Sequence, residues 1–207
     1  MSSHALALAA EQLGSRSAAT LAESGGLVLP SAIRPLSSGM RVGGPARTVL
    51  TTPGHNLWLH RAIVQAAPEE VLVVSTQEGH DFGYWGEVMG RAAAERGIAG
   101  LVIDGCVRDT AALRALPVAV FARGACIRGT GKSATGGGVG HPIAIGGVTV
   151  ATGDIVVGDD DGVVVVPASA VADVAGRAAR RDEHERTVFD AIGRGRSTIE
   201  IYGWEAT

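Results

Sequence analysis

Two short runs of sequence contain the residue types that could do chemistry on a small anionic molecule. Residues 86–89 (GEVM) open a predicted helix, with Glu87 in its first turn. Residues 105–109 (GCVRD) end in Arg108-Asp109, just past a predicted buried strand. Because the ligands of open α/β sheets gather where strands end and helices begin, we expect these two runs to form one site.

The residue types in these runs suit a 2-oxo acid that binds together with a divalent metal ion. Backbone amides in the first turn of a helix, here those of Val88 and Met89, are free to bind a carboxylate. The guanidinium of Arg108 can grip a carboxylate or a developing enolate through two hydrogen bonds. Asp109 offers hard oxygen ligands to Mg²⁺ or Mn²⁺. Such a set would stabilise the negative charge that accumulates as a carbon–carbon bond breaks.

The same residues also have ordinary structural roles. A glutamate in the first turn of a helix, such as Glu87, commonly interacts with the helix dipole. An Arg-Asp pair after a strand, such as Arg108-Asp109, commonly forms a surface salt bridge or a helix cap. Spacing alone therefore leaves both the catalytic and the structural interpretation open, and it favours the structural one.

The elements that must position these residues alternate between strand and helix. Hydrophobic patterns predict strands at 40–52, 71–76, 99–105 and 118–124, with helices at 57–67, 86–96 and 110–116 between them. Such alternation is typical of a layered α/β fold. After a glycine-rich loop at 129–140, short strands broken by Gly-Asp turns predict antiparallel pairing. The predicted fold class is therefore mixed α/β (α+β).

Helices are also predicted at the two ends of the chain. The first covers about 4–23 and is closed by Gly25-Gly26, and the second is a polar helix at about 168–194. Residues 159–161, three consecutive aspartates, are interpreted as a turn between strands. The sequence has neither an internal repeat nor a linker, so we expect residues 1–207 to form a single domain.

Composition narrows the class of protein. A net charge of −3 gives no basic surface of the kind that nucleic-acid binders show, and no uninterrupted apolar run reaches the roughly 18 residues of a membrane span. Two cysteines, Cys106 and Cys126, cannot build a disulfide framework or a four-ligand zinc site, so we expect a cytoplasmic protein. Lys132 is the only lysine, which counts against Schiff-base chemistry and favours a metal ion.

Residues 85–109 (WGEVMGRAAAERGIAGLVIDGCVRD) resemble the signature of the RraA-like family, an acid followed after twenty residues by Arg-Asp. Glu87 and Arg108-Asp109 fit this spacing. Residues 33–49, 53–63 and 146–167 also resemble family blocks, so the resemblance covers nearly the whole chain. The family includes the divalent-metal 4-hydroxy-4-methyl-2-oxoglutarate / 4-carboxy-4-hydroxy-2-oxoadipate aldolases. The resemblance implies a ββα layered, swivelling-domain-like fold.

The resemblance also implies roles for individual residues. Asp109 would bind the metal, most readily Mg²⁺ with Mn²⁺ or Co²⁺ as alternatives, and Glu87 would reach it through water. Residues 86–89 would line the pyruvyl end of the substrate, with Gly86 at their start. Arg108 would hold the C2 oxygen and stabilise the pyruvate enolate. Asn56 matches a substrate-contacting asparagine.

The family resemblance implies an assembly as well. Its members are trimers or hexamers, so we expect a homotrimer or hexamer with the site at a subunit interface. An acid on the C-terminal helix of a neighbouring subunit would complete the outer shell of the metal. Glu183 and Glu185 both lie where that acid should be, with Glu183 slightly favoured. Many family members have Asp where this chain has Glu87, which leaves the preferred metal open.

Two functions follow from the resemblance. The first is a lyase that cleaves a 4-hydroxy-2-oxo diacid to pyruvate and a second 2-oxo acid, with oxaloacetate decarboxylation as a side activity. The second resembles the ribonuclease-regulator branch of the family, a non-catalytic trimeric inhibitor. Arg108-Asp109, Asn56 and Glu87 are all present here, which a pure protein binder would not require. The sequence therefore favours the enzyme.

Lys132, in the glycine-rich loop, is interpreted as part of a flexible segment.

Overall fold

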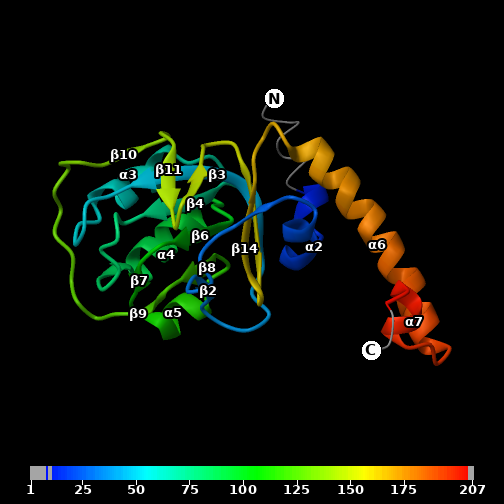
Figure 1. Ribbon diagram of the computed structural model, residues 1–207. Coiled ribbons are helices and arrows are strands. Elements are labelled where there is room, and N and C mark those ends of the chain that lie inside the picture. The colour runs from blue at the N-terminus through cyan, green and yellow to red at the C-terminus, as the bar shows by residue number, and fades with distance from the viewer. Residues whose placement is uncertain (1–7, 9–10, 205–207) are drawn as a thin grey trace.

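The computed structural model describes residue 8 and residues 11–204. A nine-stranded sheet forms its centre, with the order β1-β14-β13-β3-β4-β6-β8-β2 and β10 added along β3 (Figure 1). Its strands are β1 (Leu27–Val28), β2 (Arg34–Pro35), β3 (Val42–Leu50), β4 (Val71–Ser75), β6 (Gly100–Ile103), β8 (Ala119–Ala122), β10 (Gly138–Val139), β13 (Ile155–Asp159) and β14 (Gly162–Val166). Helices and a hairpin cover the sheet, which confirms the predicted mixed α/β class.

The middle of the sheet is parallel, in agreement with the predicted alternation of strands and helices. β3, β4, β6 and β8 pair in parallel. The helices between them are α3 (Leu57–Gln65), α4 (Glu87–Glu95) and α5 (Thr110–Arg114), which share one buried core with the sheet. Because successive side chains of a strand point to opposite faces, Leu72 of β4 joins this core and Val73 joins the core on the other face.

The rest of the sheet is antiparallel. β13 and β14 form a hairpin that pairs with β3 on one side and with β1 on the other. Of the three aspartates predicted as a turn, Asp160 and Asp161 form it, whereas Asp159 is the last residue of β13. The Asp159 carboxylate accepts hydrogen bonds from the amides of Ala18 and Asp161. A second hairpin, β11 (Ile143–Ile145) and β12 (Val148–Val150), covers the sheet on the face opposite α3 and α4.

A separate small sheet carries the residues with predicted chemistry. Its strands β5 (Gly83–Trp85), β7 (Cys106–Val107) and β9 (Gly124–Ala125) pair in parallel. The sequence predicted one strand, 99–105, just before Arg108. Instead β6 ends at Ile103, and β7 begins a new ladder after the buried Asp104, whose carboxylate accepts a hydrogen bond from Arg123 at 2.6 Å. The chain therefore changes sheets immediately before Arg108.

The predicted N-terminal helix at 4–23 is interrupted. Residues 11–14 are helical, a turn follows, and α2 (Ala18–Glu23) begins after Ser17. The hydroxyl of Ser17 accepts a hydrogen bond from the amide of Thr20 at 3.0 Å. Serine is a preferred N-cap, so the chain begins a new helix after Ser17 and the first helix does not continue through it. Residues 1–7, 9 and 10 lie outside the described part of the chain.

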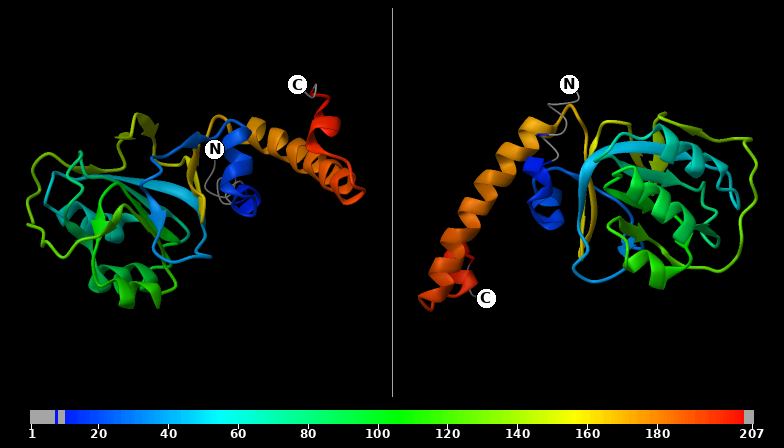
Figure 2. Two further views of the ribbon diagram at one scale, coloured as in Figure 1. Left: turned by 60° about the horizontal axis from the view of Figure 1, so that its bottom comes forward. Right: turned by 180° about the vertical axis from the view of Figure 1, so that it is seen from behind.

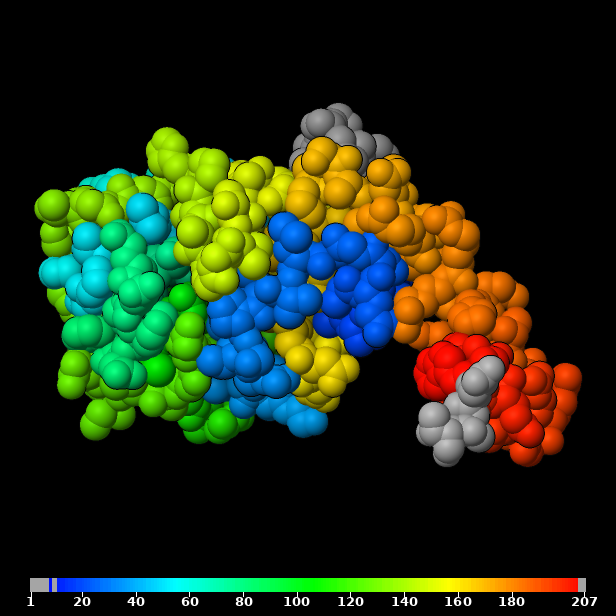
Figure 3. Space-filling model, viewed as in Figure 1, coloured from blue at the N-terminus to red at the C-terminus, as the bar shows by residue number. Residues whose placement is uncertain are grey.

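The chain ends in two helices that we call the C-terminal arm, residues 171–204. α6 (Val171–Gly193) lies within three residues of the helix predicted at 168–194, and α7 (Thr198–Tyr202) follows. The start of α6 packs against α2 and the β13–β14 hairpin. The outer half of α6 and the residues after it stand clear of the body of the molecule (Figures 2 and 3). Phe189 of α6 and Trp204, which follows α7, are exposed there. In residue 8 and residues 11–204, no helix is long and apolar enough to cross a membrane.

Candidate active site

The two runs singled out in the sequence lie side by side at the ends of β5 and β7. Asp109 is the N-cap of α5 and adopts a left-handed conformation, with φ of 55° and ψ of 39°. Its Oδ2 accepts a hydrogen bond from the amide of Glu87 at 3.0 Å. The Arg108 Nε lies 3.8 Å from the same Oδ2. Aspartate tolerates this backbone region better than most side chains, so one residue can both turn the chain and present its carboxylate to α4.

Gly86 is the residue that allows this close approach. A Cβ atom at Gly86 would lie 2.4 Å from Asp109 Oδ2 and 3.1 Å from Arg108 Cγ. The backbone of Gly86 is extended, with φ of −148°, so the requirement is for space and not for an unusual conformation. Glycine here lets the carboxylate and the guanidinium rest against the start of α4.

The start of α4 offers free backbone donors beside Asp109. The helix begins at Glu87, and its N-cap Gly86 has no side chain that could cap it. The amides of Val88 and Met89 therefore lack an acceptor within the helix. The Val88 side chain is exposed, whereas the Met89 side chain is buried in the core, so Met89 can contribute to the site only through its backbone.

The carboxylate of Glu87 is already engaged. Its Oε1 accepts hydrogen bonds from Arg91 Nε at 2.8 Å and Nη2 at 2.7 Å, one helical turn later. Such pairs are common on exposed helix faces. The structure therefore shows two contacts for Glu87: its amide holds Asp109, and its carboxylate pairs with Arg91.

Asn56 lies in a buried network beside this charged group. It precedes α3, and it is only 3% exposed. Its Nδ2 donates to the carbonyl oxygen of Tyr84 at 2.8 Å, and its Oδ1 accepts from Lys132 Nζ at 2.5 Å. Tyr84 belongs to β5, which leads to Gly86, so the network and the charged group share one strand.

Lys132 was not among the site residues predicted from the sequence. Two hydrogen bonds join the glycine-rich loop that carries Lys132 to the start of α3. The backbone N–H of Asn56 donates to the Gly131 carbonyl, and Trp58 Nε1 donates to the Ala134 carbonyl. The signal that could have identified Lys132 is that it is the only lysine of the chain. Its hydrogen bond to the buried Asn56 gives it a specific contact, and the flexibility of the loop stays a prediction.

Three titratable groups near the site have shifted pKa values. Burial, and then the charge of Lys132, lowers the pKa of His60 below its ordinary value. Burial raises the pKa of the Tyr84 hydroxyl and of the Cys106 thiol. A thiol with a raised pKa is a poor nucleophile at neutral pH, so Cys106 does not suit covalent catalysis.

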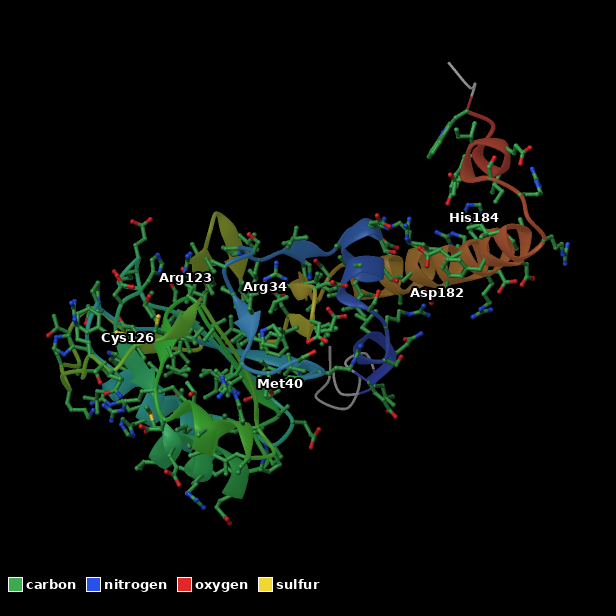
Figure 4. The ribbon with its side chains drawn as sticks, turned by 90° about the horizontal axis from the view of Figure 1, so that it is seen from below. Arg34, Met40, Arg123, Cys126, Asp182 and His184 are labelled. Atoms are coloured by element: carbon green, nitrogen blue, oxygen red, sulfur yellow. The ribbon has the colours of Figure 1, made fainter. Side chains whose placement is uncertain are left out.

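Glu183 and Glu185 lie away from this site within one chain. They belong to the outer half of α6, between Arg181 and Arg186, with which Glu185 and Glu183 form ion pairs at 3.0 Å and 2.5 Å. Figure 4 shows the flanking Asp182 and His184 on the projecting arm, far from Arg123 and Cys126 beside β9. The β13–β14 hairpin lies between the arm and helices α4 and α5 (Figure 1). A single chain therefore does not bring Glu183 or Glu185 to Asp109.

A divalent cation fits Asp109 only with help from other ligands. Among residue 8 and residues 11–204, no three His, Cys, Asp or Glu side chains gather in a way that could hold a metal ion. Mg²⁺, however, is usually bound by one or two carboxylates, with water and substrate oxygens completing the shell. The Asp109 side chain is 45% exposed, which leaves room for such ligands, so the residues present are compatible with this mode of binding.

The layered fold and the Arg-Asp pair at a helix start define a class of proteins that includes aldolases and regulators of RNA processing. A model of this class, described as "RraA-like: Aldolase/RraA", matches residues 18–165. The chain belongs to the RraA-like family. The match ends before α6, so the C-terminal arm lies beyond it.

Relatives within the family have different names. "Putative 4-hydroxy-4-methyl-2-oxoglutarate aldolase" from Halalkalibacterium halodurans is 35% identical over 176 residues, 83% of each chain. The crystal structure of an uncharacterized protein from Pseudomonas syringae is 30% identical, with a TM-score of 0.78 over 92% of this chain and 94% of the other. The RNA-processing inhibitor RraA from Thermus thermophilus is 29% identical, with a TM-score of 0.64 over 69% of this chain and 86% of the other.

Proposed function

We propose that the protein is a metal-dependent lyase that cleaves a 4-hydroxy-2-oxo diacid, of the 4-hydroxy-4-methyl-2-oxoglutarate type, into pyruvate and a second 2-oxo acid. The observation that carries the proposal is the placement of Arg108 and Asp109 against Gly86, beside the free amides at the start of α4. These groups match the pyruvyl end of such a substrate, which presents a carboxylate next to a carbonyl oxygen. The aldolase name of the relative from Halalkalibacterium halodurans supports this choice.

In the proposed reaction the residues of the chain bind and orient the substrate. The amides of Val88 and Met89 take the C1 carboxylate, because the start of a helix favours negative charge. Arg108 donates hydrogen bonds to the C2 oxygen, where negative charge accumulates as the C3–C4 bond breaks. Water held by Arg108 accepts the proton of the C4 hydroxyl, and water later protonates C3 to give pyruvate.

Asp109 would hold the divalent cation, Mg²⁺ in the first instance with Mn²⁺ or Co²⁺ as alternatives. When bound, the cation supplies Lewis-acid polarisation of the 2-oxo group. Loss of carbon dioxide from oxaloacetate places the same negative charge on the C2 oxygen, so Arg108 would also assist oxaloacetate decarboxylation as a side activity.

We also propose that a neighbouring subunit completes the site in a homotrimer or hexamer. The outer half of α6 leads away from the body of its own chain (Figure 3), so Glu183 can reach only a site on another copy. Glu185 has the same geometry, and each acid pairs with an arginine of α6. The Glu183 side chain is 69% exposed, against 34% for Glu185, and this difference supports Glu183 as the contributed acid.

The second candidate function is a regulator of RNA processing. It is favoured by one observation, the similarity to the inhibitor RraA from Thermus thermophilus. That structure corresponds to only 69% of this chain. A pull-down of purified ribonuclease with the full-length protein distinguishes the two functions, and retention of the ribonuclease would support the regulator.

The proposed lyase is tested by pyruvate release from oxaloacetate and from 4-hydroxy-4-methyl-2-oxoglutarate, with Mg²⁺ and with a chelator. We expect metal-dependent pyruvate, lost in Asp109→Ala. In Arg108→Ala, kcat should fall by about 10²–10³-fold, because removing one donor to a developing oxyanion has this effect. Turnover near the wild-type rate in either variant would contradict the site. The ratio of the two substrate rates ranks aldolase against decarboxylase.

A further inference from the structure

Tyr84 is a fully buried phenol that joins two loops beneath the candidate site. Its hydroxyl oxygen accepts a hydrogen bond from the amide of Gly54 at 2.8 Å, and the hydroxyl donates to the carbonyl oxygen of Gly79 at 2.5 Å. Because burial raises the pKa of this hydroxyl, Tyr84 keeps its proton at neutral pH and remains a donor. Both bonds therefore persist over the range in which the protein would work.

The backbone of Tyr84 holds a second part of the site. Its carbonyl oxygen accepts the bond from Asn56 Nδ2 at 2.8 Å, and Asn56 Oδ1 in turn accepts from Lys132 at 2.5 Å. Gly54, which the phenol holds, lies two residues before Asn56. Tyr84 thus holds Asn56 in two ways. Its hydroxyl holds the backbone that leads to Asn56, and its carbonyl oxygen holds the side-chain amide of Asn56.

The surroundings of the phenol leave little room for these loops to shift. A Cβ at Gly79 would lie 2.5 Å from Pro53 Cβ, and one at Gly54 would lie 3.1 Å from the ring of Phe82. The Phe82 ring packs edge-on against Tyr84, with centroids 5.9 Å apart. β5 ends at Trp85, and Gly86 follows it, two residues after Tyr84. Tyr84 therefore lies between the Asn56–Lys132 pair and the group formed by Gly86, Arg108 and Asp109.

We propose that Tyr84 is a positioning residue, which holds the Asn56 amide and the Lys132 ammonium at a fixed place relative to Arg108 and Asp109. Tyr84 itself touches no substrate in this proposal. Its effect on catalysis rests on the proposed lyase function, whereas its effect on Lys132 does not. The two can be measured separately because Lys132 is the only lysine of the chain.

The first measurement is the rate at which an amine-acylating reagent modifies Lys132, followed by mass spectrometry of its peptide. In Tyr84→Phe the phenol ring stays and only the hydroxyl is lost. We expect acylation about tenfold faster than in the wild type, because the reagent reacts with the neutral amine, and the nitrogen must leave its hydrogen bond to Asn56 before it can react. An unchanged rate in the folded variant would overturn the proposal.

Ser75→Ala is the matched control. Ser75 is also buried, and its hydroxyl also donates to a backbone carbonyl, that of Ala144 at 2.9 Å. This bond lies between β4 and β11, away from Asn56. The control should leave the acylation rate of Lys132 unchanged. A rise equal to that of Tyr84→Phe would show a general loosening of the fold and would overturn the specific role of Tyr84.

A measurement on the wild-type protein covers the case in which Tyr84→Phe fails to fold. The amide of Gly54 donates to the phenol, so its hydrogen exchange should be as slow as that of core strands such as β4. Fast exchange at Gly54 would mean that the phenol does not hold the loop, and the proposal would fall.

The effect on catalysis is tested by a double-mutant cycle. We expect Tyr84→Phe to lower kcat/KM about tenfold in the wild type and to have little further effect in Lys132→Met, because both changes act through one pair of residues. Independent, multiplicative effects would overturn the link through Lys132. Absence of any lyase activity would remove the proposed function and leave the acylation result to decide the position of Lys132.

Discussion

The candidate site has two halves that differ in exposure and in hydrogen bonding. The charged half consists of Gly86, Glu87, Arg108 and Asp109. The buried half consists of Asn56 and Tyr84, and the exposed Lys132 is hydrogen-bonded to it through Asn56. The side chains of Arg108 and Asp109 are each 45% exposed, whereas Asn56 is 3% exposed and Tyr84 is fully buried. Both polar atoms of the Asn56 amide have partners.

The difference indicates that the charged half binds the substrate and the buried half sets the geometry of the site. Groups that must receive a substrate keep donors and acceptors available, and solvent compensates their charge until the substrate arrives. Groups that set the geometry are buried, and burial requires that their polar atoms be paired. The charged half should therefore affect activity with little effect on stability, and the buried half should affect both.

Beyond the Arg108 and Asp109 variants, the largest effect is expected from Gly86→Ala in the charged half. The added Cβ would lie 2.4 Å from Asp109 Oδ2 and must displace the carboxylate. We expect kcat/KM for pyruvate release to fall about 10²-fold, since a misplacement of about 1 Å has such an effect. Alanine adopts the extended backbone of this position, so the melting temperature should change little.

Gly176→Ala provides the matched control for this substitution. Gly176 lies within α6, and a Cβ there would meet only Arg180 Nη1, at 3.7 Å. Alanine in a helix interior should raise the free energy of unfolding by about 1 kcal/mol and leave kcat/KM unchanged. If Gly86→Ala also kept wild-type kcat/KM, the close contact at Gly86 would have no role in the reaction.

A smaller effect, on stability as well as activity, is expected from Asn56→Ala in the buried half. The substitution leaves the carbonyl of the buried Tyr84 without its partner, whereas the exposed Lys132 ammonium can turn to water. We expect the free energy of unfolding, measured in urea, to fall by about 1–3 kcal/mol, the usual result of orphaning buried polar groups. Arg108→Ala should stay within about 0.5 kcal/mol, as exposed substitutions do. Equal losses in the two variants would remove the distinction between the halves.

The two halves also differ in how far the sequence predicts them. The charged half depends on short-range order: Glu87 starts α4 and Asp109 starts α5, as expected for residues that follow strands. The joining of these two helix starts follows from the parallel pairing of their strands. The sequence could therefore predict these residues and the starts of the two helices, but not the small sheet that joins them, because β5, β7 and β9 are only two or three residues long.

The buried half depends on contacts between distant parts of the chain. Lys132 is 76 residues from Asn56, and Tyr84 is 28 residues from it. Neither pair has a periodicity or a spacing that would reveal it, and glycines around Lys132 indicate flexibility when they are considered alone.

The break at Ser17 was missed for a different reason, because one local hydrogen bond overrides the helical composition on both sides.

The smallest effect concerns the pH dependence of stability at the half-buried His60 of α3, next to the buried half. Burial and Lys132 lower the pKa of His60 below its ordinary value of 6.5, so the unfolded chain takes up a proton at a higher pH than the folded chain. His60 therefore has no effect on stability well above pH 6.5 and destabilises the fold as the pH falls toward its folded-state pKa. His60→Gln should remove this loss, so urea unfolding at pH 7.5 and pH 5.5 should show a smaller decrease in stability than in the wild type.

In Lys132→Met the decrease should be intermediate, since burial still lowers the pKa of His60. If the variants and the wild type lost equal stability between the two pH values, neither burial nor the charge of Lys132 would affect the protonation of His60.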